Sequence, residues 1–259
     1  MNEKDFSRLK RRFLRYADGY RMDKPDEQRN IALKRKHTLK VCREMGFITR
    51  GEGLGAEDAL LARTTALLHD IGRFPQYAKF KTFNDGASVN HGQLGAEILL
   101  KGDFLEGLAR REQSLVIRTV RYHNAFAVPR LDKRTVFFLK LVRDADKLDI
   151  WRVFIEYFGL GKNKRPTAAG QDLPDGEDIS PGALRRVLEN RLITLAEVHN
   201  LNDYKLLLLS WVFGINFRTT FRLFRKRRCL ERLAAYLPPG EPTGRVVRHL
   251  KEFVSVRSS

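Results

Sequence analysis

The chain of 259 residues is long enough for one large domain, or for one domain with an extension. Hydrophobic residues make up 42% of it, which suffices for a sizeable core and excludes wholesale disorder. Cys42 and Cys229 are its two cysteines, and no CxxC spacing occurs. This excludes a disulfide scaffold and a cysteine-ligated zinc module, and indicates a reducing, cytoplasmic location. The longest apolar stretch, residues 206–217, is too short to span a bilayer, so no transmembrane segment and no secretory signal are expected.

The formal net charge of +18 favours a polyanionic partner, either a phosphate-bearing substrate or a nucleic acid. Residues 1–50 carry 15 basic and 7 acidic groups, residues 51–160 carry 16 and 14, and residues 161–259 carry 18 and 10. The excess therefore lies in the two flanks. The alternative interpretation is a positively charged surface that is merely solvated.

Helical periodicity dominates the first part of the chain, and alternating strand patterns are nearly absent, which predicts an all-α protein. Residues 1–24 are expected to form a basic N-terminal helical segment. Further helices are predicted over residues 31–45, 56–70, about 90–100, 112–123 and 133–158. Gly46 and Gly72 are expected to stop the first two of these, and Ser88 or Asn90 to cap the third.

Residues 161–183 hold four glycines and three prolines, which predicts a linker. Helices are expected after it over residues 182–200, 203–217, 218–236 and 243–255. The predicted organisation is a helical bundle over residues 25–160, the linker, and a helical C-terminal extension over residues 184–259 that packs on the bundle.

Four of the six histidines punctuate the first part of the chain: His37, His69, His91 and His123. Each lies on or at the end of a predicted helix, and His69 is followed directly by Asp70. An acidic string, residues 143–149, offers further carboxylates. Imidazole and carboxylate together suit Fe, Mn, Zn, Ni or Co, whereas the lack of thiolates excludes a structural zinc knot. A single histidine among apolar neighbours is more typical of a core residue than of a metal ligand. Only the four histidines and the carboxylates together therefore indicate a metal site.

The order of these residues, with the string His-Asp-Ile-Gly at its centre, resembles the HD-domain superfamily of metal-dependent phosphohydrolases over residues 30–150. The resemblance implies an HD-type helical bundle that binds two divalent cations, without distinguishing Fe, Mn, Mg, Ni, Co and Zn. It assigns the first cation to His37, His69, Asp70 and Asp146. The second falls to His91 and His123, with Asp70 bridging both cations.

The last aspartate ligand needs a choice between two candidates. Asp144 and Asp146 both lie on helical stripes of apolar residues, so periodicity does not choose between them. The family form is Ala-Asp followed by a basic residue and Leu, which matches residues 145–148. We therefore assign the ligand to Asp146.

The activity implied by the resemblance is cleavage of a phosphoester or phosphoanhydride bond in a nucleotide or related phosphorylated metabolite, by a metal-activated hydroxide. Asp70 and Arg73 are the expected catalytic residues. The basic residues beside the ligands are candidates for binding substrate phosphate: Arg73, Lys79, Lys81, Arg121 and Lys147. Their alternative role is that of solvated surface cations. The loops expected to select the substrate are residues 73–90 and 124–132.

The string of residues 217–233 spaces Phe217, Phe221 and Phe224 at helical intervals among arginines. A core-facing helix with a solvated basic face is one interpretation, and contact with nucleic acid or an anionic membrane is the other. Two alternatives to the hydrolase follow: a regulatory or nucleic-acid-binding HD scaffold without turnover, and a di-iron oxygenase. The substrate, the metal and the oligomeric state are not encoded in any pattern that we recognise.

Overall fold

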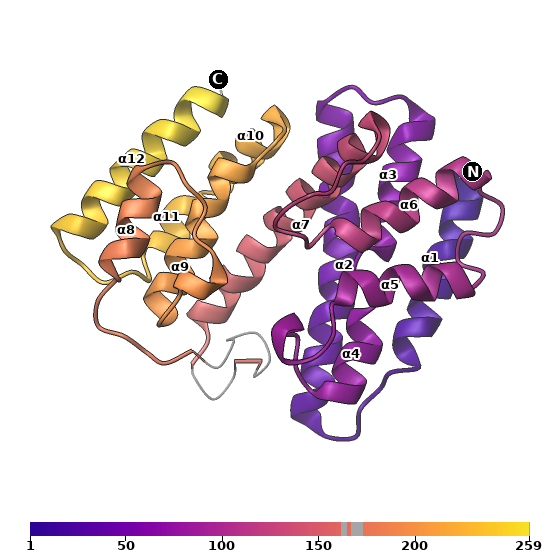
Figure 1. Cartoon of the computed structure of the whole chain (residues 1–259), viewed down its shortest axis with the longest axis horizontal. Coiled ribbons are helices and arrows are strands. Elements are labelled where there is room, and N and C mark those ends of the chain that lie inside the picture. Colours follow the sequence, from indigo (N-terminus) through magenta and orange to yellow (C-terminus); the bar gives the residue numbers. More distant parts are fainter. Residues whose placement is uncertain (162–164, 167–172, 259) are drawn as a thin grey trace. The chain divides into compact units, whose positions relative to one another are not determined.

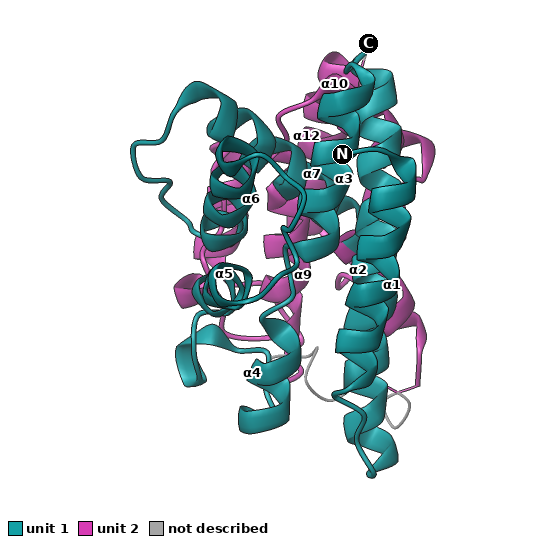
Figure 2. Cartoon of the chain, turned by 90° about the vertical axis from the view of Figure 1, so that its right-hand side faces the viewer, with its two compact units in different colours: residues 1–149, 166–169 teal, residues 150–165, 170–259 magenta. Residues whose placement is uncertain are grey.

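The structure is a computed structural model that describes residues 1–161, 165–166 and 173–258. Every regular element in these ranges is a helix, which confirms the all-α prediction (Figure 1). The described residues divide into two compact units: residues 1–149 with Pro166, and residues 150–161, 165 and 173–258 (Figure 2). The division falls within one helix, α7 (Lys133–Gly159). No helix in the described ranges is both long and apolar enough to cross a membrane.

The first unit is a bundle in which α2 packs on α3 and α5 packs on α6, while α1 and α6 also contact α3. Before α7, its elements are α1 (Glu3–Asp18), α2 (Pro25–Gly51), α3 (Ala56–Leu68), α4 (Arg73–Phe80), a 3-10 turn (Asp85–Ala87), α5 (His91–Lys101) and α6 (Arg110–Tyr122). Apolar residues three to four positions apart face inward, as Met45 and Ile48 of α2 and Val116 and Val120 of α6 do. The core that they build surrounds the ends of α3 and α6.

Two local predictions in this unit are wrong. Helix α2 continues through Gly46 to Gly51. The burial of its neighbours Met45 and Ile48 outweighs the roughly 1 kcal/mol that a glycine costs inside a helix. Residues 73–80 form helix α4, so the predicted loop 73–90 begins only at Lys81. At α5 the cap is Asn90, whose side chain accepts a hydrogen bond from the backbone of Gln93.

The second unit begins at the C-terminal part of α7. Its other elements are α8 (Pro181–Leu188), a 3-10 turn (Leu195–Glu197), α9 (Leu201–Ser210), a 3-10 turn (Trp211–Gly214), α10 (Arg218–Lys226), α11 (Cys229–Ala234) and α12 (Glu241–Ser258). Trp151 is fully buried in its core, 4.4 Å from the ring of Phe224, and its indole nitrogen donates to the carbonyl of Leu208. Helices α8 and α10 both pack on α12.

Three helices predicted in this second unit, over residues 182–200, 203–217 and 218–236, are shorter or interrupted, whereas the last one is longer and runs from Glu241 to Ser258. Residues 182–200 are helical only to Leu188, because Asn190 adopts a left-handed backbone conformation with a φ of 57°. The helix predicted over residues 218–236 is interrupted in the same way at Arg228, whose backbone φ is 52°. Of the predicted linker, residues 162–164 and 167–172 lie outside the described residues, and residues 173–180 are not helical.

The turn between α3 and α4 is the feature of the fold that places the histidines. A Cβ atom on Gly72 would lie 2.3 Å from the carbonyl oxygen of His91 and 2.7 Å from the backbone nitrogen of Gly95. Only a glycine therefore allows this turn to lie against the start of α5. The close approach brings His69 and Asp70 next to His91.

Gly46 and Gly72 form a matched pair that tests this account. We expect Gly72→Ala to lower the free energy of unfolding by about 1–3 kcal/mol, because the added methyl group collides with backbone atoms. Gly46→Ala should raise it by about 1 kcal/mol, since the position is helical and no atom lies within 4 Å of the added Cβ. Urea denaturation of both variants measures the difference. A Gly72→Ala variant as stable as the wild type would contradict the close approach.

Candidate metal centre

The four histidines and two aspartates singled out in the sequence come together in the first unit. They are carried by α2 (His37), the turn after α3 (His69, Asp70), the start of α5 (His91), the residue after α6 (His123) and α7 (Asp146). Five of the six are buried, and the side chain of Asp146 is 20% exposed. Helix ends supply four of these positions, which lets short side chains from separate elements reach one point.

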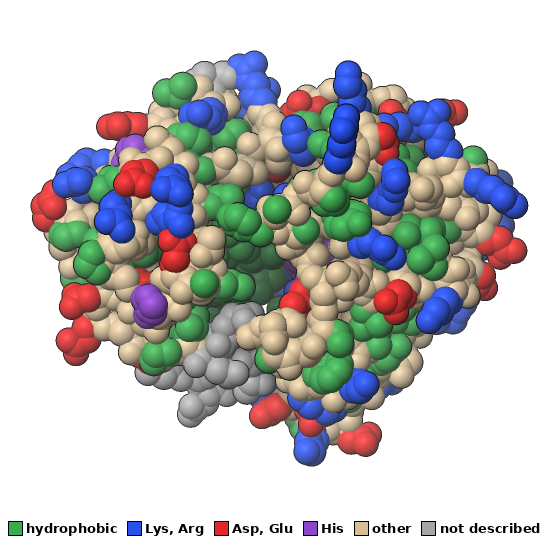
Figure 3. All heavy atoms as spheres, viewed as in Figure 1, with side chains coloured by type: hydrophobic (Ala, Val, Ile, Leu, Met, Phe, Trp, Pro, Cys, Tyr) green, Lys and Arg blue, Asp and Glu red, His purple; other side chains and the backbone are tan. Residues whose placement is uncertain are grey.

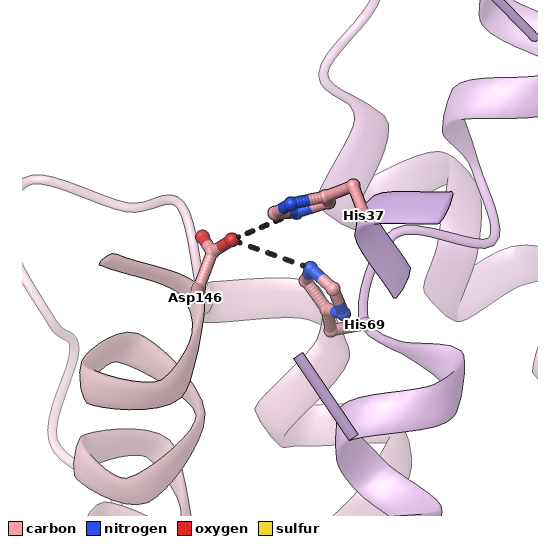
Figure 4. A group of neighbouring side chains, drawn as sticks. All are labelled: His37, His69 and Asp146. Carbon is pink, nitrogen blue, oxygen red and sulfur yellow. Dashed lines mark ion pairs between the residues drawn. The ribbon is translucent and has the colours of Figure 1, made fainter. Parts of the chain in front are cut away.

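The first group consists of His37, His69 and Asp146 (Figure 4). The Oδ1 atom of Asp146 lies 3.0 Å from Nε2 of His37 and 3.6 Å from Nε2 of His69. The ligand atoms of the three residues lie within 4.8 Å of one another. Asp144, the other candidate, is fully buried and is not part of this group.

Asp70 lies between this group and the remaining two histidines. Its Oδ2 atom is 3.7 Å from Nε2 of His37 and 3.8 Å from Nε2 of His69. Its Oδ1 atom is 3.3 Å from Nε2 of His91 and 3.7 Å from Nε2 of His123. The two oxygens of one carboxylate therefore face two different pairs of histidines.

All four imidazoles are oriented by a hydrogen bond at the other ring nitrogen. The Nδ1 atom of His37 lies 2.7 Å from a carboxylate oxygen of Asp149, and that of His91 lies 2.7 Å from Asp85. The Nδ1 atoms of His69 and His123 lie 2.8 Å and 2.7 Å from backbone carbonyls three residues earlier. With Nδ1–H as the donor, each Nε2 presents a lone pair to the cluster.

The cluster is rich in acceptor atoms that lack donors. Nε2 of His37, Nε2 of His69 and Oδ1 of Asp146 are buried and have no hydrogen-bond partner among the described residues. Buried polar atoms are normally satisfied, so three such atoms at one point indicate a missing positive partner. Nitrogen and oxygen donors in this combination suit a borderline divalent cation, and the residues fit such an ion.

The charge states of the Asp70 and Asp146 carboxylates also suit a divalent cation. Burial alone would raise the pKa of Asp70 and Asp146, but neighbouring positive charges hold both well below the usual value. For Asp70 the largest of these charges is Lys34, and for Asp146 the groups that lower the pKa are the neighbouring imidazoles of His37 and His69. Both carboxylates are therefore ionised at neutral pH.

The histidines differ from one another in their protonation. Burial lowers the pKa of His91 to about 3, with Arg73 adding to the effect, so this ring is neutral. Burial also opposes protonation of His37, but the carboxylates of Asp146 and Asp149 outweigh it and raise the pKa to about 9. A divalent cation held by His37 and Asp146 would compete with protonation of His37, because a histidine ligand has to be neutral.

Two basic residues contact Asp70 directly. Lys34, on α2, donates to Oδ2 of Asp70 over 2.9 Å. The Nε atom of Arg73 lies 3.5 Å from Oδ1, while its NH1 atom donates to Gln76, Asp85 and the carbonyl of Phe83. Arg73 is thus held firmly beside the cluster.

The other predicted phosphate-binding residues are placed differently. Lys79 is exposed over the ring of Phe80, and exposed Lys81 pairs with Glu27. Arg121 is half-buried beside His123, and its Nε atom is buried without a hydrogen-bond partner among the described residues. Lys147 is half-buried, and burial lowers its pKa.

Three residues that build the site are not singled out by the sequence patterns: Lys34, Asp85 and Asp149, of which Asp149 lies within the acidic string 143–149. Lys34 precedes His37 by three residues, and Asp149 follows Asp146 by three, so helical spacing could have suggested both. Asp85 gave no such signal, because it lies in a short turn. Its carboxylate accepts hydrogen bonds from Arg73, Gln76, His91 and Asn124 and so joins α4, α5 and the end of α6.

Comparison with protein families gives one match: residues 35–151 fit the family described as HD domain. The matched range contains all six residues of the cluster. No curated protein and no solved structure matches the chain.

Asp85→Asn tests whether this carboxylate is a structural hub of the site. Asparagine offers one acceptor oxygen in place of two and adds a donor that faces existing donors. We expect the free energy of unfolding to fall by about 2–3 kcal/mol. Asp58→Asn is the matched control, because its partly exposed pair with Arg134 should contribute less than about 1 kcal/mol. Equal losses in urea denaturation would show that Asp85 is an ordinary surface carboxylate.

Proposed function

Since residues 35–151 make this chain a member of the HD-domain superfamily, we propose that it is a metal-dependent phosphohydrolase. It would cleave a phosphoester or phosphoanhydride bond in a nucleotide or related phosphorylated metabolite. The observation that carries the proposal is the group of buried acceptor atoms on His37, His69 and Asp146 that lack donors among the described residues. A divalent cation would satisfy these atoms, and the family is largely one of metal-dependent hydrolases.

The proposed centre holds two cations. His37, His69, Asp70 and Asp146 would bind the first, and the second would be bound by Asp70, His91 and His123. The division of the Asp70 oxygens between two pairs of histidines supports this assignment. When bound, divalent cations supply Lewis acidity to phosphoryl oxygens and lower the pKa of water.

The chain's own residues prepare this chemistry. Asp85 and Asp149 fix the tautomers of His91 and His37, so that each Nε2 stays available. Lys34 and Arg73 keep the carboxylate of Asp70 ionised. We propose that Arg73 and Arg121, which lie beside cluster residues, also contact substrate phosphate. The same role for Lys79, Lys81 and Lys147 stays a prediction.

The nucleotide nature of the substrate and a cytoplasmic location complete the proposal. The net charge of +18 favours a polyanionic substrate. Cys42 and Cys229 are both free, which suits a reducing compartment. Burial raises the pKa of the Cys42 thiol to about 12, so this side chain stays protonated and is no nucleophile of the reaction.

A panel of phosphorylated substrates, assayed with Mn, Fe and Mg on anaerobically purified protein, tests the activity. Turnover that disappears with a chelator and returns with one of the metals is expected. No turnover with any metal would contradict the proposal and favour a scaffold. Oxygen consumption with a polyol would instead identify a di-iron oxygenase.

Metal content tests the assignment of ligands. Elemental analysis should find about two ions in the wild type, one in His91→Ala or His123→Ala, and none in Asp70→Ala, because Asp70 is the proposed bridge. Activity should fall by several orders of magnitude in all three variants. His249→Ala, at an exposed hydrogen bond to Asn190, is the matched control and should keep both ions and full activity. One ion in the wild type, unchanged in the His91 and His123 variants, would make the site mononuclear.

A further inference from the structure

Helix α10 of the second unit carries a strongly basic surface that the proposed hydrolase does not use. Residues 216–230 contain six lysines and arginines and no aspartate or glutamate. Five of these residues are exposed and define the α10 basic face: Arg218, Arg222, Arg225, Lys226 and Arg228. On the view in Figure 3, in contrast, basic and acidic side chains are interspersed over much of the surface.

The α10 basic face lacks partners among the residues that the structure describes. None of its five side chains forms an ion pair or hydrogen bond with a described residue. Basic residues elsewhere are paired in the same structure, as Arg134 is with Asp58, and Arg186 with Glu197. Exposed basic residues without an ion-pair partner among the described residues also occur on α1, but that helix carries acidic residues as well. What distinguishes α10 is therefore a run of basic residues that no acidic residue interrupts.

This arrangement destabilises the helix that carries it. Arg218 and Arg222, and Arg222 and Lys226, are four residues apart, so like charges face each other along the helix surface. Arg218 also lies in the first turn, where the helix dipole disfavours positive charge. A bound polyanion would offset both effects. Its negative charges would weaken the repulsion between the cations, and the helix dipole favours negative charge near the first turn.

The opposite face of α10 is occupied. Phe224 is buried against Trp151, and Phe221 is buried with its ring 6.3 Å from that of Phe253 on α12. The helix therefore has no apolar face left to insert into a bilayer, which weighs against a membrane partner. Both aromatic side chains of α10 are buried, so the helix offers no exposed ring on which a nucleic-acid base could stack.

We propose that the α10 basic face binds the phosphodiester backbone of a nucleic acid without reading its sequence. Arg218, Arg222 and Arg225 lie on one stripe that extends about 10 Å along the helix axis, so several phosphates can be contacted at once. Phosphate contacts from arginine give affinity without base specificity. The proposal does not depend on the metal centre or on the activity assigned to it.

Fluorescence anisotropy with labelled duplex DNA, duplex RNA and single strands of mixed sequence, over a range of salt concentrations, measures this binding on the full chain. We expect sequence-independent binding whose logarithmic affinity falls steeply with salt. The triple variant Arg218→Gln, Arg222→Gln, Arg225→Gln should lose at least tenfold in affinity, and its salt slope should shrink by about 2–3. The variant should melt at the same temperature as the wild type or higher, because repulsion is relieved.

The matched control removes the same charge from exposed positions of α1, with Lys10→Gln, Arg11→Gln and Arg15→Gln. This helix carries acidic residues as well, and the control should bind almost as the wild type does. Equal losses in the two triple variants would show that net charge alone acts, which overturns the proposal. No binding by the wild type at moderate salt would overturn it too, as would binding only to anionic phosphatidylserine vesicles.

Discussion

The buried carboxylate of Asp70 is the constraint on which the rest of the first unit depends. An ionised carboxylate without water is costly unless positive charge or donors surround it. The chain meets this requirement with the ammonium group of Lys34 on α2 and the guanidinium group of Arg73 on α4. Each of these groups comes from a different element, so the bundle has to close around Asp70 before its charge is compensated.

The same requirement explains why glycines and short turns lie next to the site. Gly72 follows Asp70 by two residues and leaves room for the backbone of α5, and Gly92 lies against the end of α6, where an added Cβ would be 2.8 Å from the carbonyl of Arg121. Arg143 on α7 donates to the carbonyls of Tyr122 and His123, which have no partner within α6. The end of α6, which carries His123 of the cluster, is thereby capped by a side chain from a neighbouring helix.

The sequence predicts the class of the fold and the positions of long helices well, because amphipathic spacing decides them. The helix predicted over residues 133–158 is observed as Lys133–Gly159. Predictions that rested on a single glycine were less accurate. Gly46 was expected to end a helix, but α2 continues beyond it because its neighbouring residues are buried. In the second unit, the left-handed residues Asn190 and Arg228 interrupt predicted helices. Asparagine is enriched in this conformation, whereas arginine gives no such signal.

At the site, motif order brought out the six residues that the structure places together, since order along the chain survives folding. The residues that orient them were not found from sequence, because their contacts exist only in three dimensions. Asp149 meets His37 across 112 positions of the chain, and Asp85 meets Asn124 across 39. In the sequence, such a carboxylate cannot be told from any other acidic residue of a helix or turn. Only the fold shows which imidazole it contacts.

The cluster of the first unit and the α10 basic face of the second unit differ in how their charges are compensated. In the first unit, charges with little exposure are matched by partners within a few ångströms, as Lys34 is by Asp70 and Arg73 is by Asp85. In the second, α10 exposes arginines that no described carboxylate neutralises. A buried charge has to be satisfied inside the fold, because water cannot reach it. An exposed charge can remain without an ion-pair partner, because water and dissolved salt screen it. The stability of the first unit is therefore tied to its site, whereas α10 can keep an uncompensated surface at a cost that its buried phenylalanines offset.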